Sequence, residues 1–356
     1  MATPTPGSEK MPSRSVPTSG TTTPAATSAT IEFDPTGDLY LIVGPSSQEM
    51  RVDSRALCRS STVFRKMLSE TFAEAKPKKG EWRVRLPEDD VHPFALLMDI
   101  VHSVYERATP KMAASHLYQL CILTNKYDMA QALRPMASKW LAPYSSPQML
   151  REPKGFSITN MMFIAWEMGH CVIFEALVKV VAWRHNSNRN NDLIYPNGTL
   201  LQDTCRFSSH GTLEHITKYR QDVLAAVRKS CHDTIRKLLA KERASTFCAR
   251  NKCPLRAGTI NDAAILGDIL QRSQELGIIE FFDHKEGSPK FTGNLTDLKH
   301  KLSTIRDSNV SCSCGGPVAL ILASMTRESD AKHPLVVKDW HKKHLSIQAA
   351  KTKVLV

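Results

Sequence analysis

The stretch DLYLIV at residues 38–43 decides the fold of the first part of the chain, together with the segments GPSS at 44–47 and EMRV at 49–52 that follow it. Tyr, Leu, Ile and Val side chains favour an extended strand, and Gly-Pro-Ser-Ser is typical of a tight turn. The chain can then return as a partner strand, so we predict a β-hairpin over residues 38–52.

The residues after the hairpin show first a helical and then a strand pattern. Apolar side chains at helical spacing predict two short helices, at 54–58 and 61–68. Segment 81–86 (EWRVRL) alternates polar and apolar side chains with a period of two, which predicts a third strand. The basic residues at 76–80 are interpreted as a solvated loop between helix and strand, in preference to a nuclear address.

Three helices are predicted after the third strand. Asp90 is a suitable N-cap for the first helix and Ser115 for the second, which ends at Tyr127. The third helix is expected from about residue 133 to residue 141, with Pro135 in its first turn. Short strands beside these helices predict an α+β fold.

Four segments of this region resemble the BTB/POZ domain, and in particular the fungal branch of that family. They are GDLYL at 37–41, LCRSSTVFRKML at 57–68, LPEDD at 86–90 and LTNKYD at 123–128. The resemblance covers about residues 36–143. It implies a small sheet flanked by a helical cluster that binds other proteins, followed by a mostly α-helical C-terminal region.

Composition and this resemblance together divide the chain into four parts. Residues 1–30 are rich in Ser, Thr and Pro, so we expect a disordered tail. The BTB/POZ domain is expected at 31–143, and a helical C-terminal domain at 144–330. Residues 331–356 are rich in Lys and are interpreted as a basic C-terminal tail.

The start of the second half resembles the paired helices that follow the BTB domain in fungal proteins. These helices are expected over residues 156–183, with a break at Gly169-His170. Three charged side chains, Glu167 among them, interrupt this apolar stretch, so it predicts core helices and no membrane span. Apolar residues at near-helical intervals over 212–240 predict one long helix or a broken pair.

The resemblance also implies a specific partner. BTB proteins that recruit the cullin scaffolds of ubiquitin ligases have an apolar-x-Glu motif shortly after the Phe-x-x-Met segment, and Phe72-Ala73-Glu74 stands in the matching place. Phe72 would fill an apolar pocket on the cullin, and Glu74 would supply a charge at its rim. The alternative is that Phe72 closes the core of its own domain. The residues expected at a cullin contact are Phe64, Met67, Leu68, Phe72 and Glu74.

The sequence leaves self-association open. Many animal members of the family have a helix and a strand before the hairpin and exchange them across a dimer, whereas Ser/Thr/Pro-rich residues precede the hairpin here. Asp53 also stands where many of those members have a His. A homodimer through the remaining helices and a monomer are both compatible with the sequence.

Four cysteines of the second half have a spacing that a metal site could use. They form two pairs, Cys248 with Cys253 and Cys312 with Cys314. Two pairs of thiolates could hold a structural zinc ion that staples a region with little core. Reduced thiols and a redox pair are the alternatives, and no other cofactor is expected.

Signatures of catalysis are missing from the sequence. It contains no Gly-x-Gly-x-x-Gly after a strand, no phosphate-binding loop, no His-Glu-x-x-His and no Gly-x-Ser-x-Gly elbow, so we expect a non-catalytic protein. The net charge is +12, and residues 144–356 hold thirty Lys and Arg against twenty Asp and Glu. The alternative function is therefore a transcription- or chromatin-associated protein whose basic half contacts nucleic acid or an acidic partner.

The N-terminal residues do not have the pattern of a secretory signal, which is a basic patch followed by an apolar run. We therefore expect an intracellular protein of the cytoplasm, the nucleus or both. Protein partners are expected, nucleic acid is not the favoured partner, and no association with a membrane is expected.

Overall fold

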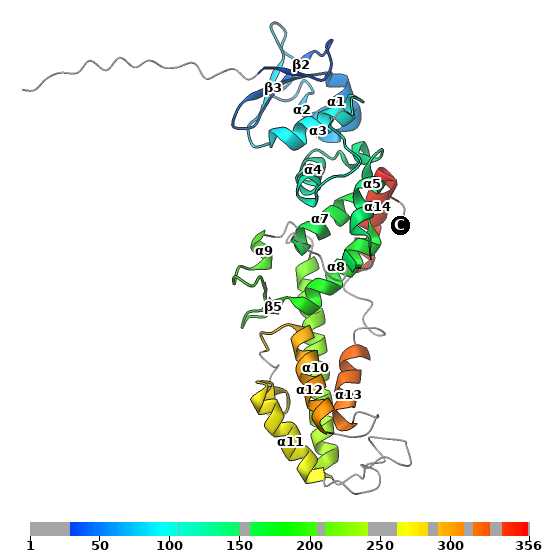
Figure 1. Ribbon diagram of the computed structural model, residues 1–356. Helices are drawn as coiled ribbons and strands as arrows, with labels where there is room; N and C mark the ends of the chain where they lie inside the picture. The colour runs from blue at the N-terminus through cyan, green and yellow to red at the C-terminus, as the bar shows by residue number, and fades with distance from the viewer. Residues whose placement is uncertain are drawn as a thin grey trace, which may run out of the picture.

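The computed structural model describes residues 29–105, 107–146, 148–149, 157–204, 211–240, 262–283, 291–309, 316–327 and 337–354. Within these residues the fold is α+β, as predicted, with a small sheet near the N-terminus and a long series of helices after it (Figure 1). The predicted tail at 1–30 lies outside the described residues except for Ala29 and Thr30.

The larger sheet has four strands in the order β1-β3-β2-β4. Their bounds are β1 Ile31–Glu32, β2 Leu39–Val43, β3 Gln48–Val52 and β4 Arg83–Leu86. β2 and β3 form the predicted antiparallel hairpin, with Leu41 opposite Met50, and β4 pairs in parallel with β2. Gly44 makes the hairpin turn with a φ of 73°, a conformation that residues with a Cβ rarely adopt. β1 was not predicted from the sequence, and it pairs in parallel with β3.

The helices of this domain complete its hydrophobic core. They are α1 Ser54–Ser60, α2 Thr62–Met67, α3 Val91–Val101, α4 Ala114–Lys126 and α5 Ala137–Leu141, with the 3-10 helices η1 Ala130–Leu133 and η2 Ala142–Tyr144. The side chains of Asp53, Ser61 and Asp90 accept hydrogen bonds from the first turns of α1, α2 and α3. The predicted role of Asp90 is therefore confirmed.

Two details of the predicted helices were wrong. α4 begins at Ala114, so the predicted cap Ser115 lies inside its first turn, and the capping position belongs to Ala113, whose side chain makes no capping hydrogen bond. The helix expected over residues 133–141 is divided into η1 and α5, and Pro135 between them has no backbone N–H to donate to a helical hydrogen bond.

The paired helices predicted after this domain are confirmed as α7 Ile158–Met168 and α8 Cys171–Arg184. Gly169 ends α7 with a φ of 77°, and the Nδ1 atom of His170 accepts a hydrogen bond from the N–H of Ile173. A small hairpin follows, with β5 Asn186–Ser187 and β6 Leu193–Ile194, and then the short helix α9 Leu201–Thr204.

The predicted long helix is continuous, as α10 Thr212–Leu239. α11 Asp262–Glu275 and α13 Gly316–Arg327 pack against it, α12 Leu295–Asn309 packs against α11 and α13, and η5 Ile279–Phe281 follows α11 (Figure 1). Buried apolar side chains along α10, such as Val223 and Val227, form the centre of this helical bundle.

Most of the expected basic tail at 331–356 is a packed helix. Residues 337–354 are described, and α14 Asp339–Thr352 packs against α7, α8 and η1. The sequence pattern concealed this helix because polar side chains occupy much of its buried face. His341 lies 3.0 Å from the hydroxyl of Thr212, and the hydroxyl of Thr352 donates to the carbonyl of Met168 at 2.8 Å.

The molecule is elongated, with the larger sheet at one end and the bundle of α10 to α13 at the other (Figure 1). α14 lies between these ends, next to η1 and α7, so that the end of the chain returns towards the N-terminal domain. In the parts of the chain that the structure describes, no helix combines the length and hydrophobicity that crossing a bilayer requires.

Candidate functional site

Phe72 lies in the connection between α2 and β4, and 53% of its surface is exposed. Turn hydrogen bonds on both sides of it shape this connection. The N–H of Phe72 donates to the carbonyl of Ser69 at 3.2 Å, and the N–H of Ala75 donates to the carbonyl of Phe72 at 3.1 Å. Leu68, at the beginning of the connection, is buried in the core. An aromatic ring is thus held outside the core on a structured turn.

The other end of this connection is fixed to the sheet. Trp82 is 7% exposed, and its Nε1 atom donates a hydrogen bond of 2.8 Å to the carbonyl oxygen of Glu74. The Nζ atom of Lys76 lies 5.6 Å from the centre of the Trp82 ring and 3.1 Å from the carboxylate of Asp38. Both ends of the segment at residues 68–82 are therefore anchored, and Phe72 projects from between them. We call this segment the Phe72 loop.

Asp38 connects the Phe72 loop to the start of α1. Its carboxylate accepts hydrogen bonds from the backbone N–H and the hydroxyl of Ser54, at 2.9 and 3.1 Å, in addition to the contact from Lys76. Burial alone would raise the pKa of Asp38, but these hydrogen bonds and the charge of Lys76 together lower it. Asp38 is therefore ionised at neutral pH, which favours its ion pair with the loop.

The five residues predicted for a cullin contact are divided between core and surface. Phe64 is fully buried, and its ring stacks on Tyr127 with the centroids 4.4 Å apart. The side chains of Phe64 and Leu68 lie in the hydrophobic core. This corrects the expectation that they contact a partner directly. Met67 is partly buried and packs against the same core.

Phe72 is the predicted residue that is largely exposed, and Glu74, two residues later, is partly buried. The exposure of Phe72 contradicts the alternative in which its ring closes the core. The carboxylate of Glu74 has neither an ion pair nor a hydrogen bond with another described residue, although its backbone carbonyl binds Trp82. One apolar and one acidic group are thus both available on the Phe72 loop.

The proposed zinc ligands Cys248, Cys253, Cys312 and Cys314 lie outside the described residues, so the zinc site stays a prediction. Among the residues that are described, no group of three or more His, Cys, Asp or Glu side chains is arranged to hold a metal ion. Cys231, another cysteine of the second half, is fully buried in α10, and this burial raises the pKa of its thiol. Cys231 is therefore part of the helical core.

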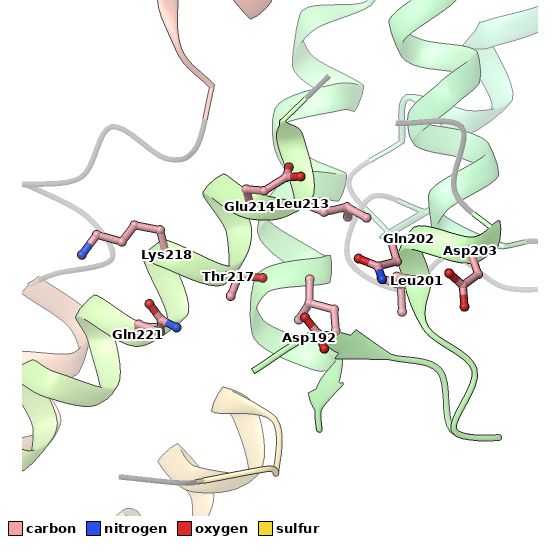
Figure 2. A pocket seen from close by; sticks show the side chains of 10 residues that line it. Asp192, Leu201, Gln202, Asp203, Leu213, Glu214, Thr217, Lys218 and Gln221 are labelled. Carbon is pink, nitrogen blue, oxygen red and sulfur yellow. The ribbon is translucent and has the colours of Figure 1, made fainter. Parts of the chain in front are cut away.

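A cleft of about 390 Å³ lies in the helical half, between α10 and the β6–α9 segment. Figure 2 shows Thr217 on α10 across from Asp192, with Glu214 also on α10 and Asp203 at the end of the cleft beside Gln202. The lysine in its lining, Lys218, forms an ion pair of 2.8 Å with Asp222. The cleft is thus acidic, but none of its lining residues forms part of a metal-binding group.

Ion pairs within single helices neutralise part of the positive charge of this half. Four basic side chains pair with acids three or four residues away on the same helix. The pairs are Lys218–Asp222, Arg236–Asp233, Arg272–Asp268 and Lys301–Asp297. These contacts are typical of solvated helix surfaces.

Glu167 has a structural role that the sequence did not predict. It belongs to α7 and is 1% exposed, with hydrogen bonds from Thr124 at 3.3 Å and Asn125 at 3.1 Å. Burial raises its pKa to about 7, while these hydrogen bonds and the charge of Lys351 act in the opposite direction. A carboxylate within an apolar stretch was the signal that could have identified a buried polar junction.

Comparisons with known proteins return no relationship: no family model, no curated protein and no solved structure matches this chain. The evidence for function is therefore the geometry of the site itself.

Proposed function

We propose that this protein is a non-catalytic interaction module of the BTB/POZ type, and that it serves as an adaptor for a cullin scaffold. The observation that carries the proposal is the exposed ring of Phe72 on an anchored loop. Large aromatic side chains supply much of the binding free energy at the centres of protein interfaces. Phe72 also stands at the position of the cullin-type motif in the sequence.

The anchoring of the Phe72 loop supports this role. Ordering a mobile loop on binding costs conformational entropy, and a loop that is already fixed avoids much of that cost. Trp82 and Lys76 fix one end of the loop, and the burial of Leu68 fixes the other. Glu74 adds an acidic group two residues from Phe72, which suits a basic or hydrogen-bond-donating rim on the partner.

The direct test is calorimetric titration of the full chain with the purified N-terminal domain of a cullin from the same organism. Wild-type protein is expected to bind. Phe72→Ala should weaken binding by about 2 kcal/mol, roughly 30-fold, because no aromatic ring would then fill the apolar pocket on the cullin. Glu74→Lys should also weaken binding. Val172→Ala is the matched control, since Val172 is 51% exposed on α8 and outside the proposed contact.

Thermal unfolding of each variant distinguishes lost binding from lost structure. Phe72→Ala should unfold at the wild-type temperature, because the ring contributes little to the core. Failure of the wild-type protein to bind the cullin would end the adaptor proposal. Equal affinities for wild-type protein and Phe72→Ala would remove the Phe72 loop from the contact.

A further inference from the structure

A groove of about 510 Å³ lies on the N-terminal domain, between the first turns of α3 and α4 and the loop at 107–113. Apolar atoms of Pro93, Leu96 and Met112 contribute to its lining, and Leu96 is 8% exposed and belongs to the core. This volume falls within the range of sites that accept a ligand or a few side chains of a partner. The groove thus has an apolar part of useful size.

The loop that forms one wall of the groove is held in place by the core of the domain. The Nε1 atom of the buried Trp140 donates to the carbonyl of Thr109 at 2.8 Å, and the hydroxyl of Tyr144 donates to the carbonyl of Met112 at 3.0 Å. The hydroxyl of Thr109 also donates to the carbonyl of Lys111 at 2.7 Å. The wall is therefore formed before any partner binds.

Hydrogen-bond donors predominate at the rim of the groove. Arg107 pairs with the fully buried Asp99 at one end, and Asp90 is the one carboxylate among the lining residues. The carboxylate of Asp90 already accepts a hydrogen bond from the first turn of α3. The lining side chains without an ion pair or hydrogen bond to another described residue include Lys111, His92 and His116.

From this distribution we infer that the groove is an interaction surface for a short acidic segment of a partner protein. An apolar side chain of that segment would lie against Pro93, Leu96 and Met112. Carboxylates on either side of it would accept hydrogen bonds from Lys111 and the neighbouring imidazoles. This surface is separate in sequence from the Phe72 loop, and the inference does not rest on cullin binding.

The test begins with selection of random peptides, displayed on phage, against the full-length protein. We expect the recovered peptides to have several Asp or Glu residues around one large apolar residue. The affinity of one such synthetic peptide, measured by fluorescence anisotropy, should fall about tenfold for Lys111→Glu and should decrease with salt. Replacing the apolar residue of the peptide with Ser should also weaken binding.

Two variants serve as controls for these measurements. Lys79→Glu makes the same charge change at an exposed position outside the groove, and Phe72→Ala alters the other proposed surface. Both should bind the peptide like wild-type protein. Recovery of neutral or basic peptides, recovery of none, or equal effects of Lys111→Glu and Lys79→Glu would each overturn the inference. A dimer that Lys111→Glu dissociates, observed by light scattering, would assign the groove to a second copy and would also overturn it.

Discussion

The side-chain amide of Gln348, in the last helix, donates a hydrogen bond of 3.2 Å to the buried carboxylate of Glu167 in α7. The same carboxylate accepts hydrogen bonds from Thr124 and Asn125 at the end of α4. One side chain therefore joins the N-terminal domain, the first helix pair and the C-terminal helix. This polar junction is reinforced by an ion pair of 2.8 Å between Lys351 and Asp128.

The first prediction concerns the pH dependence of stability at this junction. The pKa of Glu167 is raised to about 7 in the folded protein from an ordinary value of 4.5. The contribution of neutral Glu167 is thus fully present below about pH 4.5 and is lost as the pH rises through 7. Glu167→Gln has no carboxyl group to titrate, so it should not show this loss. The free energy of unfolding of the variant minus that of wild-type protein should therefore be about 3 kcal/mol larger at pH 8 than at pH 4.5.

Urea unfolding of both proteins across this pH range measures the difference. Glu70→Gln is the matched control, because Glu70 is exposed and its substitution should leave the pH dependence unchanged. Parallel stability curves for wild-type protein and Glu167→Gln would show that the junction does not titrate in this range.

The second prediction concerns the close approach of α7 and α14 at Gly169. A Cβ atom at this position would lie 2.1 Å from the backbone nitrogen of Ala349 and 2.6 Å from the carbonyl oxygen of Leu345. Gly169→Ala should therefore displace α14 and expose its C-terminal residues to proteolysis. Gly198→Ala provides the control, since Gly198 also has a positive φ but has no atom within 4 Å of its Cβ position.

Thermal unfolding and limited proteolysis of the two glycine variants separate backbone strain from steric overlap. Gly198→Ala should cost about 1 kcal/mol through its left-handed backbone alone. Gly169→Ala should cost clearly more and should release the C-terminal segment. Equal effects of the two substitutions would contradict the packing of α14 on Gly169.

The third prediction concerns the anchor of the Phe72 loop. Trp82→Phe retains an aromatic ring but removes the donor to the carbonyl of Glu74, so it should lower stability by about 1 kcal/mol and weaken cullin binding. Trp183→Phe removes a similar hydrogen bond, from Trp183 to the hydroxyl of Tyr219, in the helical half. It should change stability without changing cullin affinity. Calorimetric titration of both variants measures this contrast, and equal affinities would argue against the anchor.

The local elements of the N-terminal domain could be predicted because their signals lie within a few residues of each other. Gly44 marks the hairpin turn and Asp90 begins α3, and in the same way Gly169 ends α7 after this domain. Errors occurred where the local signal does not decide the structure. Ser115, for example, has a side chain suited to a cap but lies inside the first turn of α4.

The C-terminal helix could not be predicted for the same physical reason. Hydrophobic periodicity identifies a buried face only when that face is apolar. In α14 the buried face includes His341, Gln348 and Thr352, whose partners lie far away in sequence. Within the candidate site, the positions of Phe72 and Glu74 could be predicted from the motif. The anchor from Trp82 could not, because it depends on the position of β4 beside the loop.

Hydrogen exchange of the full chain, measured with and without the cullin N-terminal domain, shows whether the Phe72 loop contacts the cullin. The Phe72 loop should exchange more slowly in the complex, at residues 69–75, while the C-terminal helix should show no change. This protection should be absent when Phe72→Ala is mixed with the same cullin domain. Protection confined to other parts of the chain, with none at residues 69–75, would contradict the account.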